Sequence, residues 1–375
     1  MSDLPEPAAK ALETFATEAA ASAVATDKQG QFPVAVAKSF LASGLAGLMS
    51  ARDFGGSGAG LRQASAVVER VARACGSTAM IVTMHYSGVS VIEAFASPDV
   101  RKSVASGHAL TTLAFSEAGS RSHFWAPVST ARREGIEIVL DAKKSWVTSA
   151  NHAGLFVWSS QGTSGQGGSI WLVSRETAGI ASAAPFDGLG LRGNDSAPVT
   201  AQGARIPAAN LLGEDGKGGD VMLGTVLPVF AVLNASAALG LMNAAVERTI
   251  AHASGTQFQH LGQALSSLPT IRAYIARMRI KTDQVRALLN DTLTALENPS
   301  GITMLRVLEV KAAAGEAATE VTDLAMRVCG GAAFRKEVGV ERIFRDARAG
   351  TVMAPTTDQL YDFIGRALCG LDLFA

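Results

Sequence analysis

The feature that most constrains this chain is a long stretch without a charged residue, which runs from Val221 to Val246. A helix of that length could span a bilayer. A proline and several amide and hydroxyl side chains interrupt the stretch, namely Pro228, Asn234, Ser236 and Asn243. These interruptions favour a buried helix at the centre of a bundle over a membrane segment. We therefore expect no membrane partner.

The charge balance argues against a nucleic-acid binder, because 33 Lys and Arg residues are matched by 33 Asp and Glu and leave no basic excess. Hydrophobic residues make up 48% of the chain and charged residues 18%, which argues against disorder. Cys75, Cys329 and Cys369 lie far apart, and no histidine belongs to an HExxH motif. We expect no metal site. The cysteine usage and the absence of a signal-peptide pattern predict a cytoplasmic protein.

The pattern changes twice along the chain, which predicts an α+β protein with segregated helices and strands. We place an N-terminal helical domain at residues 1–108, a middle β domain at 109–217 and a C-terminal helical domain at 218–375. In the middle block, alternating segments around Arg133-Glu134-Gly135 indicate a hairpin, and the short strands indicate a small barrel or sandwich. The expected helices span 6–24, 33–48, 61–74, 78–94, 218–254, 269–296, 302–329, 340–347 and 357–369.

One literal GxGxxG motif occurs at Gly188–Gly193. It lies in the β block and opens no helix, so we interpret it as a glycine-rich turn rather than a dinucleotide loop. A second pattern is more informative, because Trp146 and Thr148 place an indole near a hydroxyl group, while small hydroxyl residues follow the apolar run 111–115. A planar, electron-accepting ring needs a stacking face and hydrogen bonds at its edge. The alternative is a buried tryptophan among ordinary turns.

In this order, the segments 113–122, 144–148, 190–196 and 341–348 resemble the acyl-CoA dehydrogenase family over nearly the whole chain. The resemblance implies an N-terminal helical domain, a middle β-barrel domain and a C-terminal helix bundle. It also implies FAD, with FMN as the alternative, between the β domain and the C-terminal helices of a homodimer or homotetramer. By motif match, the cofactor-binding residues would be Phe115, Ser116, Ser122, Trp146, Thr148 and Thr356.

The departures from the family pattern concern catalysis. Ala118 and Arg121 replace a proline and a glycine of the first motif. Ala354 stands where the family has the glutamate that takes the substrate's α-proton, and Phe230 and Ala231 stand at the alternative position on the central helix. A hydrocarbon side chain cannot accept a proton. The catalytic residue is thus unknown, and these three positions would line an uncharged substrate pocket.

Two further residues are candidates for the missing base. Asp358 follows Ala354 closely, but Thr356-x-x-Gln359 resembles a capping box, in which Asp358 would only favour the helix dipole. His85 lies on an apolar helix that would border the family's substrate pocket. A packed or capping histidine is the alternative.

The family's cofactor clamp from the neighbouring subunit also differs. The arginine of its R-x-x-F-G motif is lost at Gly255, while its Q-x-x-G-G motif becomes Arg327-Val328-Cys329-Gly330-Gly331. We hypothesise that Arg327 replaces the lost guanidinium at the pyrophosphate, beside Gly330 and Gly331. The alternative is an exposed arginine on a turn.

Three functions remain open from the sequence. The first is an FAD-dependent oxidoreductase that takes a hydride from an acyl-CoA, with an electron-transfer flavoprotein as partner. The second is a flavin-dependent monooxygenase of the same fold that acts on an apolar or aromatic compound, with a flavin reductase as partner. The third is a non-catalytic flavin or ligand binder.

Overall fold

The computed structural model describes residues 4–120 and 123–373. The chain divides into two compact units. The first unit takes in the chain up to Val67, Met80–Gly188 and Arg192–Phe230, and the second takes in Val68–Ala79, Leu189–Leu191 and the chain from Ala231 onward.

The N-terminal helices are α1 (Glu6–Gln29), α2 (Val34–Ala42), α3 (Leu61–Ala72), α4 (Gly76–Phe95) and α5 (Pro98–Ala105). The prediction that the first helix stops before Asp27 was wrong, because Asp27 is buried and the helix ends only at Gly30, with φ 63°. The second helix is shorter than predicted. Leu45 and Leu48 lie in the turns that follow this helix, where both are buried. Their apolar spacing therefore indicated buried positions and not a helix.

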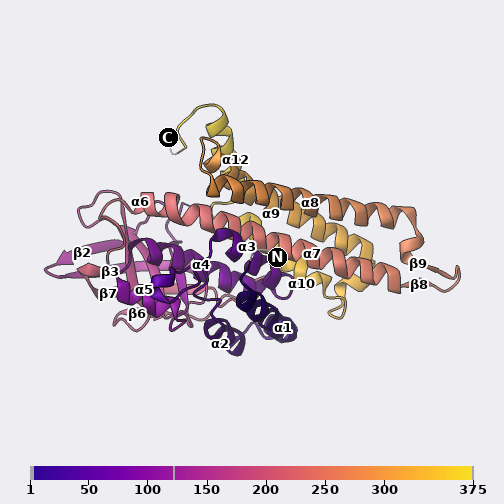
Figure 1. Cartoon of the computed structure of the whole chain (residues 1–375), viewed down its shortest axis with the longest axis horizontal. Coiled ribbons are helices and arrows are strands. Elements are labelled where there is room, and N and C mark those ends of the chain that lie inside the picture. The colour runs from indigo at the N-terminus through magenta and orange to yellow at the C-terminus, as the bar shows by residue number, and fades with distance from the viewer. Residues whose placement is uncertain (1–3, 121–122, 374–375) are drawn as a thin grey trace. The chain divides into compact units, whose positions relative to one another are not determined.

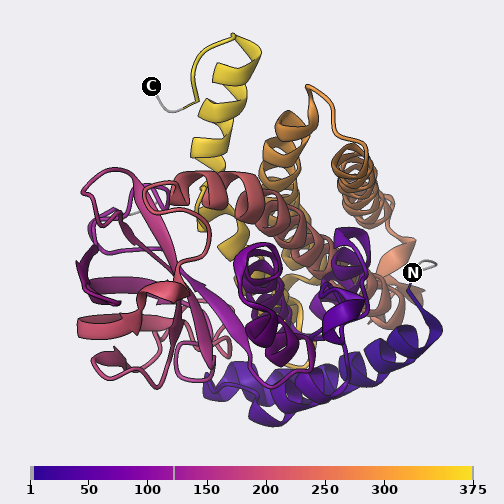
Figure 2. The same ribbon diagram turned by 60° about the vertical axis from the view of Figure 1, so that its left-hand side comes forward.

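The strands of the first unit form two sheets (Figure 2). Buried apolar residues from both sheets form one core. In the first sheet, β1 (Thr111–Ala114) pairs in parallel with β4 (Leu155–Gln161), which pairs antiparallel with β5 (Gly168–Ser174). The second sheet is antiparallel, in the order β2 (Thr130–Glu134), β3 (Glu137–Val147), β7 (Ala197–Pro207) and β6 (Ile180–Ser182). Glu134 pairs with Glu137, which confirms the predicted hairpin.

The C-terminal helices are α8 (Pro269–Glu297), α9 (Thr303–Cys329), α10 (Val340–Ala347), α11 (Ala349–Val352) and α12 (Thr357–Leu368). The short hairpin β8–β9 (Gln257–Phe258 and Gln263–Ala264) precedes them, and α8 and α9 lie side by side along α7 (Leu227–Gly255) (Figure 1). Helices α8, α9, α10 and α12 reproduce the predicted segments closely, whereas α11 was not predicted.

The uncharged stretch forms one continuous helical segment. It starts with α6 (Gly218–Asp220), passes through a π-helical turn at Val221–Val226 and continues as α7 (Leu227–Gly255). Among the described residues it is the one helix long and apolar enough to cross a membrane, and 72% of its most apolar window is buried inside the protein. Such burial is typical of a core helix.

Close packing within the second unit depends on Gly240 of α7. A Cβ atom at this position would lie 2.3 Å from the carbonyl oxygen of Glu69 and 2.6 Å from the Cβ of Ala72, both on α3. No side chain fits unless the helices move apart.

We expect Gly240→Val to lower the free energy of unfolding by about 1–3 kcal/mol, because overpacking forces the helices to shift. The measurement is urea denaturation followed by circular dichroism. Gly224→Ala is the matched control, since no atom lies within 4 Å of a Cβ placed there and alanine favours the helix. Equal destabilisation by both changes would contradict the packing explanation.

Candidate active site

The two sequence motifs that resemble a flavin site lie side by side in the first unit. Phe115 and Ser116 follow β1, and Trp146 belongs to the end of β3. The backbone N–H of Ser145 donates to the carbonyl oxygen of Ser116 over 2.9 Å, and Glu117 forms a bridge with Lys144. The fold therefore joins segments that are distant in the sequence.

A buried ion pair fixes this junction. Lys144 Nζ contacts Glu117 Oε1 and also donates to the carbonyl oxygen of Ser159 over 2.6 Å. The second carboxylate oxygen accepts from the backbone N–H groups of Val128 and Ser129, at 2.6 and 3.0 Å. Burial lowers the pKa of Lys144 to about 8, against the opposing effect of the carboxylate. Burial would raise the pKa of Glu117, but the charge and hydrogen bonds of Lys144 outweigh it and hold that pKa below its ordinary value.

Trp146 has an unusual backbone and an exposed side chain. Its φ is 56°, in the left-handed region that non-glycine residues seldom adopt, and the pairing of β3 with β7 shifts register between Lys144 and Val147. Such bulges re-aim side chains and are common beside active sites. The indole is 60% exposed and packs on Phe186 with ring centroids 4.2 Å apart.

The turn after Trp146 is held by the segment that follows the GxGxxG motif. Thr148 is buried, with its hydroxyl 3.4 Å from that of Ser196. The N–H of Ser149 donates to the carbonyl oxygen of Asn194 over 2.9 Å, and Asp195 accepts from the N–H of Asn151 over 2.7 Å. The glycine motif opens no helix, which confirms the turn interpretation. The residues directly after it, Asn194 to Ser196, make the contacts to the Trp146 segment.

These residues fit a flavin. Trp146 offers an aromatic face, and the hydroxyl oxygen of Ser120 is buried without a hydrogen-bond partner among residues 4–120 and 123–373. A buried hydroxyl group without a hydrogen-bond partner is unfavourable, and a bound group that forms a hydrogen bond with it would explain its presence. Phe115 is buried and Ser116 half-buried beside it, while Ser122 lies outside the described residues.

The loop that carries Ala354 lies in the second unit and is held by one buried lysine. Lys311 Nζ, on α9, donates to the carbonyl oxygens of Met353 and Pro355 at 2.9 and 2.7 Å, and contacts that of Gly350 at 3.4 Å. These contacts surround Ala354 but do not involve its side chain. The sequence pattern gave no sign of this clamp, because Lys311 occupies an interior position of an amphipathic helix.

Both candidate bases lie among the described residues. His85 is fully buried, Nε2 lies 3.0 Å from the carbonyl oxygen of Ala46, and Nδ1 accepts from the N–H of Thr111 over 3.1 Å. Burial lowers its pKa to about 4. These contacts favour the alternative of a packed histidine, and a role of His85 as a base stays a prediction. Thr356 caps α12 by accepting from the N–H of Gln359, as predicted, with Asp358 in the first turn.

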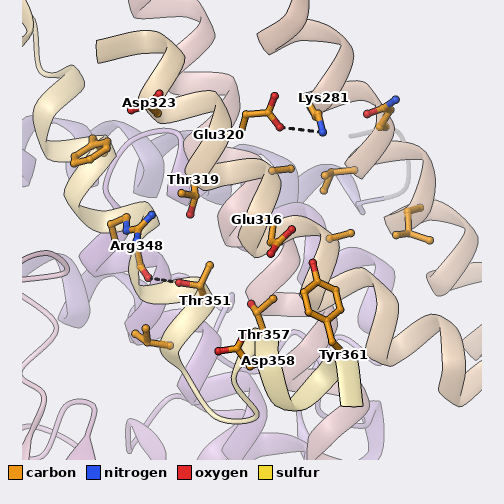
Figure 3. Close-up of a pocket in the computed structure, with 17 residues that line it drawn as sticks. Lys281, Glu316, Thr319, Glu320, Asp323, Arg348, Thr351, Thr357, Asp358 and Tyr361 are labelled. Carbon is orange, nitrogen blue, oxygen red and sulfur yellow. Dashed lines mark hydrogen bonds and ion pairs between the residues drawn. The ribbon is translucent and has the colours of Figure 1, made fainter. Parts of the chain in front are cut away.

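Asp358 instead lines a groove of about 1130 Å³ bounded by α8, α9 and α12 (Figure 3). The groove is polar, with Lys281 and Glu320 paired at 2.9 Å. The hydroxyl of Tyr361 is hydrogen-bonded to Glu316, and burial together with this carboxylate raises its pKa to about 12. Among the other predicted site residues that the structure describes, none lines this groove.

Arg327 ends α9 beside Gly330, which has φ 54°. Its guanidinium lies 4.9 Å from the ring centroid of Tyr274 and donates to the hydroxyl over 3.2 Å. The side chain is exposed and held on a tyrosine of α8. No group of three or more metal-ligating side chains gathers within residues 4–120 and 123–373.

We expect Lys311→Met to lower the free energy of unfolding by about 1–3 kcal/mol, because buried carbonyl groups lose their donor. Lys281→Met is the control, since that side chain is 41% exposed and its ion pair contributes about 0–1 kcal/mol.

The loss should also depend on pH. Burial lowers the pKa of Lys311 to about 7 from 10.5. Between these values the unfolded chain binds a proton that the folded chain lacks, so the stability of the unchanged protein relative to Lys311→Met should rise with pH. Urea denaturation at pH 7 and pH 9.5 tests this, and a difference that does not vary would contradict the assignment.

Comparisons with known proteins agree with this architecture. Three family models match, described as the acyl-CoA dehydrogenase N-terminal domain over 6–109, the middle domain over 112–203 and the C-terminal domain over 216–369. A probable acyl-CoA dehydrogenase of Bacillus subtilis is 30% identical, over 88% of each chain. The solved butyryl-CoA dehydrogenase of Megasphaera elsdenii has a TM-score of 0.90 at 20% identity, over 98% of this chain and 100% of that one. A solved prolyl acyl carrier protein oxidase has a TM-score of 0.87 at 19% identity, over 97% and 99%. The chain thus belongs to the acyl-CoA dehydrogenase family of flavin-dependent oxidoreductases.

Proposed function

We propose that the protein is an FAD-dependent oxidoreductase that accepts a hydride from an acyl thioester without a carboxylate at position 354. The observation that carries this proposal is the pairing of the two motif segments in the first unit, where Trp146 and Ser120 offer a stacking face and an unpartnered hydroxyl. When bound, FAD would supply the hydride acceptor.

In this dehydrogenation the substrate loses a hydride from Cβ to the flavin and a proton from Cα, and because position 354 offers no base, that proton would pass to water. The protein's own residues would bind and position the flavin and the substrate. Trp146 would stack on the flavin, and Thr148 and Ser120 would hydrogen-bond to it. Thr356 and, from a partner subunit, Arg327 with Gly330 and Gly331 would contact the dinucleotide. The Lys311 clamp would orient the loop against which the substrate lies. Phe230, Ala231 and Ala354 would keep that side of the substrate free of charge.

The second candidate is a monooxygenase that uses reduced flavin and O₂. It is favoured by the hydrocarbon side chains at positions 230, 231 and 354, since oxygenation needs no base to remove an α-proton. The substrate would then be an apolar or aromatic compound. The partner would be a flavin reductase, rather than the electron-transfer flavoprotein that a dehydrogenase requires.

The other properties of the proposed enzyme follow from its family. We propose FAD rather than FMN and a homodimer or homotetramer. The cytoplasmic location that we propose rests on the cysteine pattern and not on the family. The domain limits that we propose remain 1–108, 109–217 and 218–375.

Anaerobic mixing with acyl-CoA thioesters separates the two functions. We expect the flavin absorbance to bleach with at least one thioester of the panel. If none bleaches the flavin but reduced flavin and O₂ give a product, the second candidate holds. If neither occurs, the protein is a flavin or ligand binder. Ala354→Glu should raise the rate of bleaching, because it places a carboxylate on the clamped loop. Ala349→Glu, on α11, is the control and should not raise it.

Arg327→Ala should weaken FAD binding about tenfold or more, because the planar guanidinium would be lost from the pyrophosphate. The measurement is the fluorescence of released flavin during dilution. Arg277→Ala is the control, since Arg277 is also exposed on the surface of the second unit and pairs with Glu320 at 3.3 Å. Unchanged affinity in Arg327→Ala would contradict the role of Arg327.

A further inference from the structure

Asn234 is one of the polar residues in the apolar part of α7, with Ser236 and Asn243. It lies one helical turn after Phe230 and Ala231, and only 3% of the residue is exposed. Its Nδ2 atom lies 3.5 Å from the sulfur of Met353, the residue before Ala354. An amide group therefore stands beside the clamped loop, close to the position where the family has its catalytic carboxylate.

The oxygen of this amide lacks a partner. Oδ1 of Asn234 is buried and accepts no hydrogen bond from any residue that the structure describes. The thioether of Met353 has no donor and can only accept, which turns the NH₂ group toward the sulfur and fixes the orientation of the amide. A buried polar atom without a partner is unfavourable for the fold, so its presence calls for a ligand or another compensation.

A second asparagine on the same helix behaves differently. Asn243 is also buried, but its Nδ2 donates to Glu69 over 3.3 Å and to the carbonyl oxygen of Leu239 over 3.0 Å, and its Oδ1 lies 3.5 Å from Arg279. Its amide is fully engaged in packing. The contrast shows that a buried asparagine of α7 can be satisfied by the protein, and that Asn234 is not.

A glycine of α11 lies beside Asn234. A Cβ atom placed on Gly350 would lie 3.7 Å from Oδ1 of Asn234, which is ordinary contact, and 3.7 Å from the Cα of Gly315 on α9. Because Gly350 has no side chain, none extends from this position over the unpartnered oxygen.

We propose that Asn234 determines substrate specificity by accepting a hydrogen bond from a hydroxyl or amine group of the acyl chain, close to the reacting carbons. The proposal rests on the proposed function, because it places the acyl chain beside Ala354. It narrows the substrate class from a plain hydrocarbon acyl group to an acyl group that carries a donor at its β or γ carbon.

The experiment measures binding rather than turnover. The flavin-loaded protein is titrated anaerobically in a calorimeter with three near-isosteric probes: pentanoyl-CoA, γ-hydroxybutanoyl-CoA and γ-fluorobutanoyl-CoA. A matched β-substituted set follows, with 3-methylbutanoyl-CoA and its β-hydroxy and β-fluoro analogues. In one of the two sets we expect the hydroxyl compound to bind about tenfold more tightly than both its methyl and its fluoro analogue.

Asn234→Leu should abolish this preference, and it should raise the thermal midpoint because a buried unpartnered group is removed. Asn243→Ala is the matched control, which should lower the midpoint and keep the preference. A preference that survives in Asn234→Leu would overturn the proposal, as would failure of the unchanged protein to bind or distinguish the probes. Failure of the proposed reaction would appear separately, as unbleached flavin in a protein that still binds the hydroxyl compound.

Discussion

The buried contact between Glu117 and Lys144 is the interaction on which the candidate flavin site depends. It joins two segments that belong to different sheets of the first unit, and it does so where neither charge meets water. If Glu117 or Lys144 were buried without the other, its charge would have no partner. The two segments must therefore fold together. The bulge at Trp146 begins directly beyond this junction. The unusual backbone of Trp146 can persist because its surroundings are fixed on both sides.

The second unit solves a related problem with a different arrangement. Lys311 is also fully buried, but its partners are main-chain carbonyl groups rather than a carboxylate. The ion pair of the first unit holds strands in register, whereas the lysine of the second unit shapes a loop between two short helices. In both places a buried lysine is tolerated because its N–H groups donate hydrogen bonds.

Much of the fold was predictable because helix and strand periods change at clear places in the sequence. The hairpin at Glu134 and the helices around Gly240 followed from local pattern alone. The ends of α1 and α2 did not, because burial of Asp27 and Leu45 is decided by residues that are distant in the sequence. At the site, motif order predicted a flavin contact for Trp146, and the fold gives this residue an exposed indole at a strand bulge.

Sequence pattern could not reveal which polar residues lie unpartnered. His85 and Asn234 both interrupt apolar helices, and nothing local distinguishes them. The fold gives His85 two hydrogen-bond partners and leaves the oxygen of Asn234 with none. The same limit applies to Lys311, whose carbonyl partners become neighbours only through tertiary packing.

The Lys311 clamp has a consequence for how this loop can change. Lys311 donates to main-chain carbonyl groups and does not contact the side chain at position 354. The backbone path of the loop is therefore independent of the functional group that position 354 carries. A carboxylate can be lost, or a different group gained, while the backbone stays in place. The loop can thus carry different functional groups on the same backbone, and a change of reaction does not require a new fold.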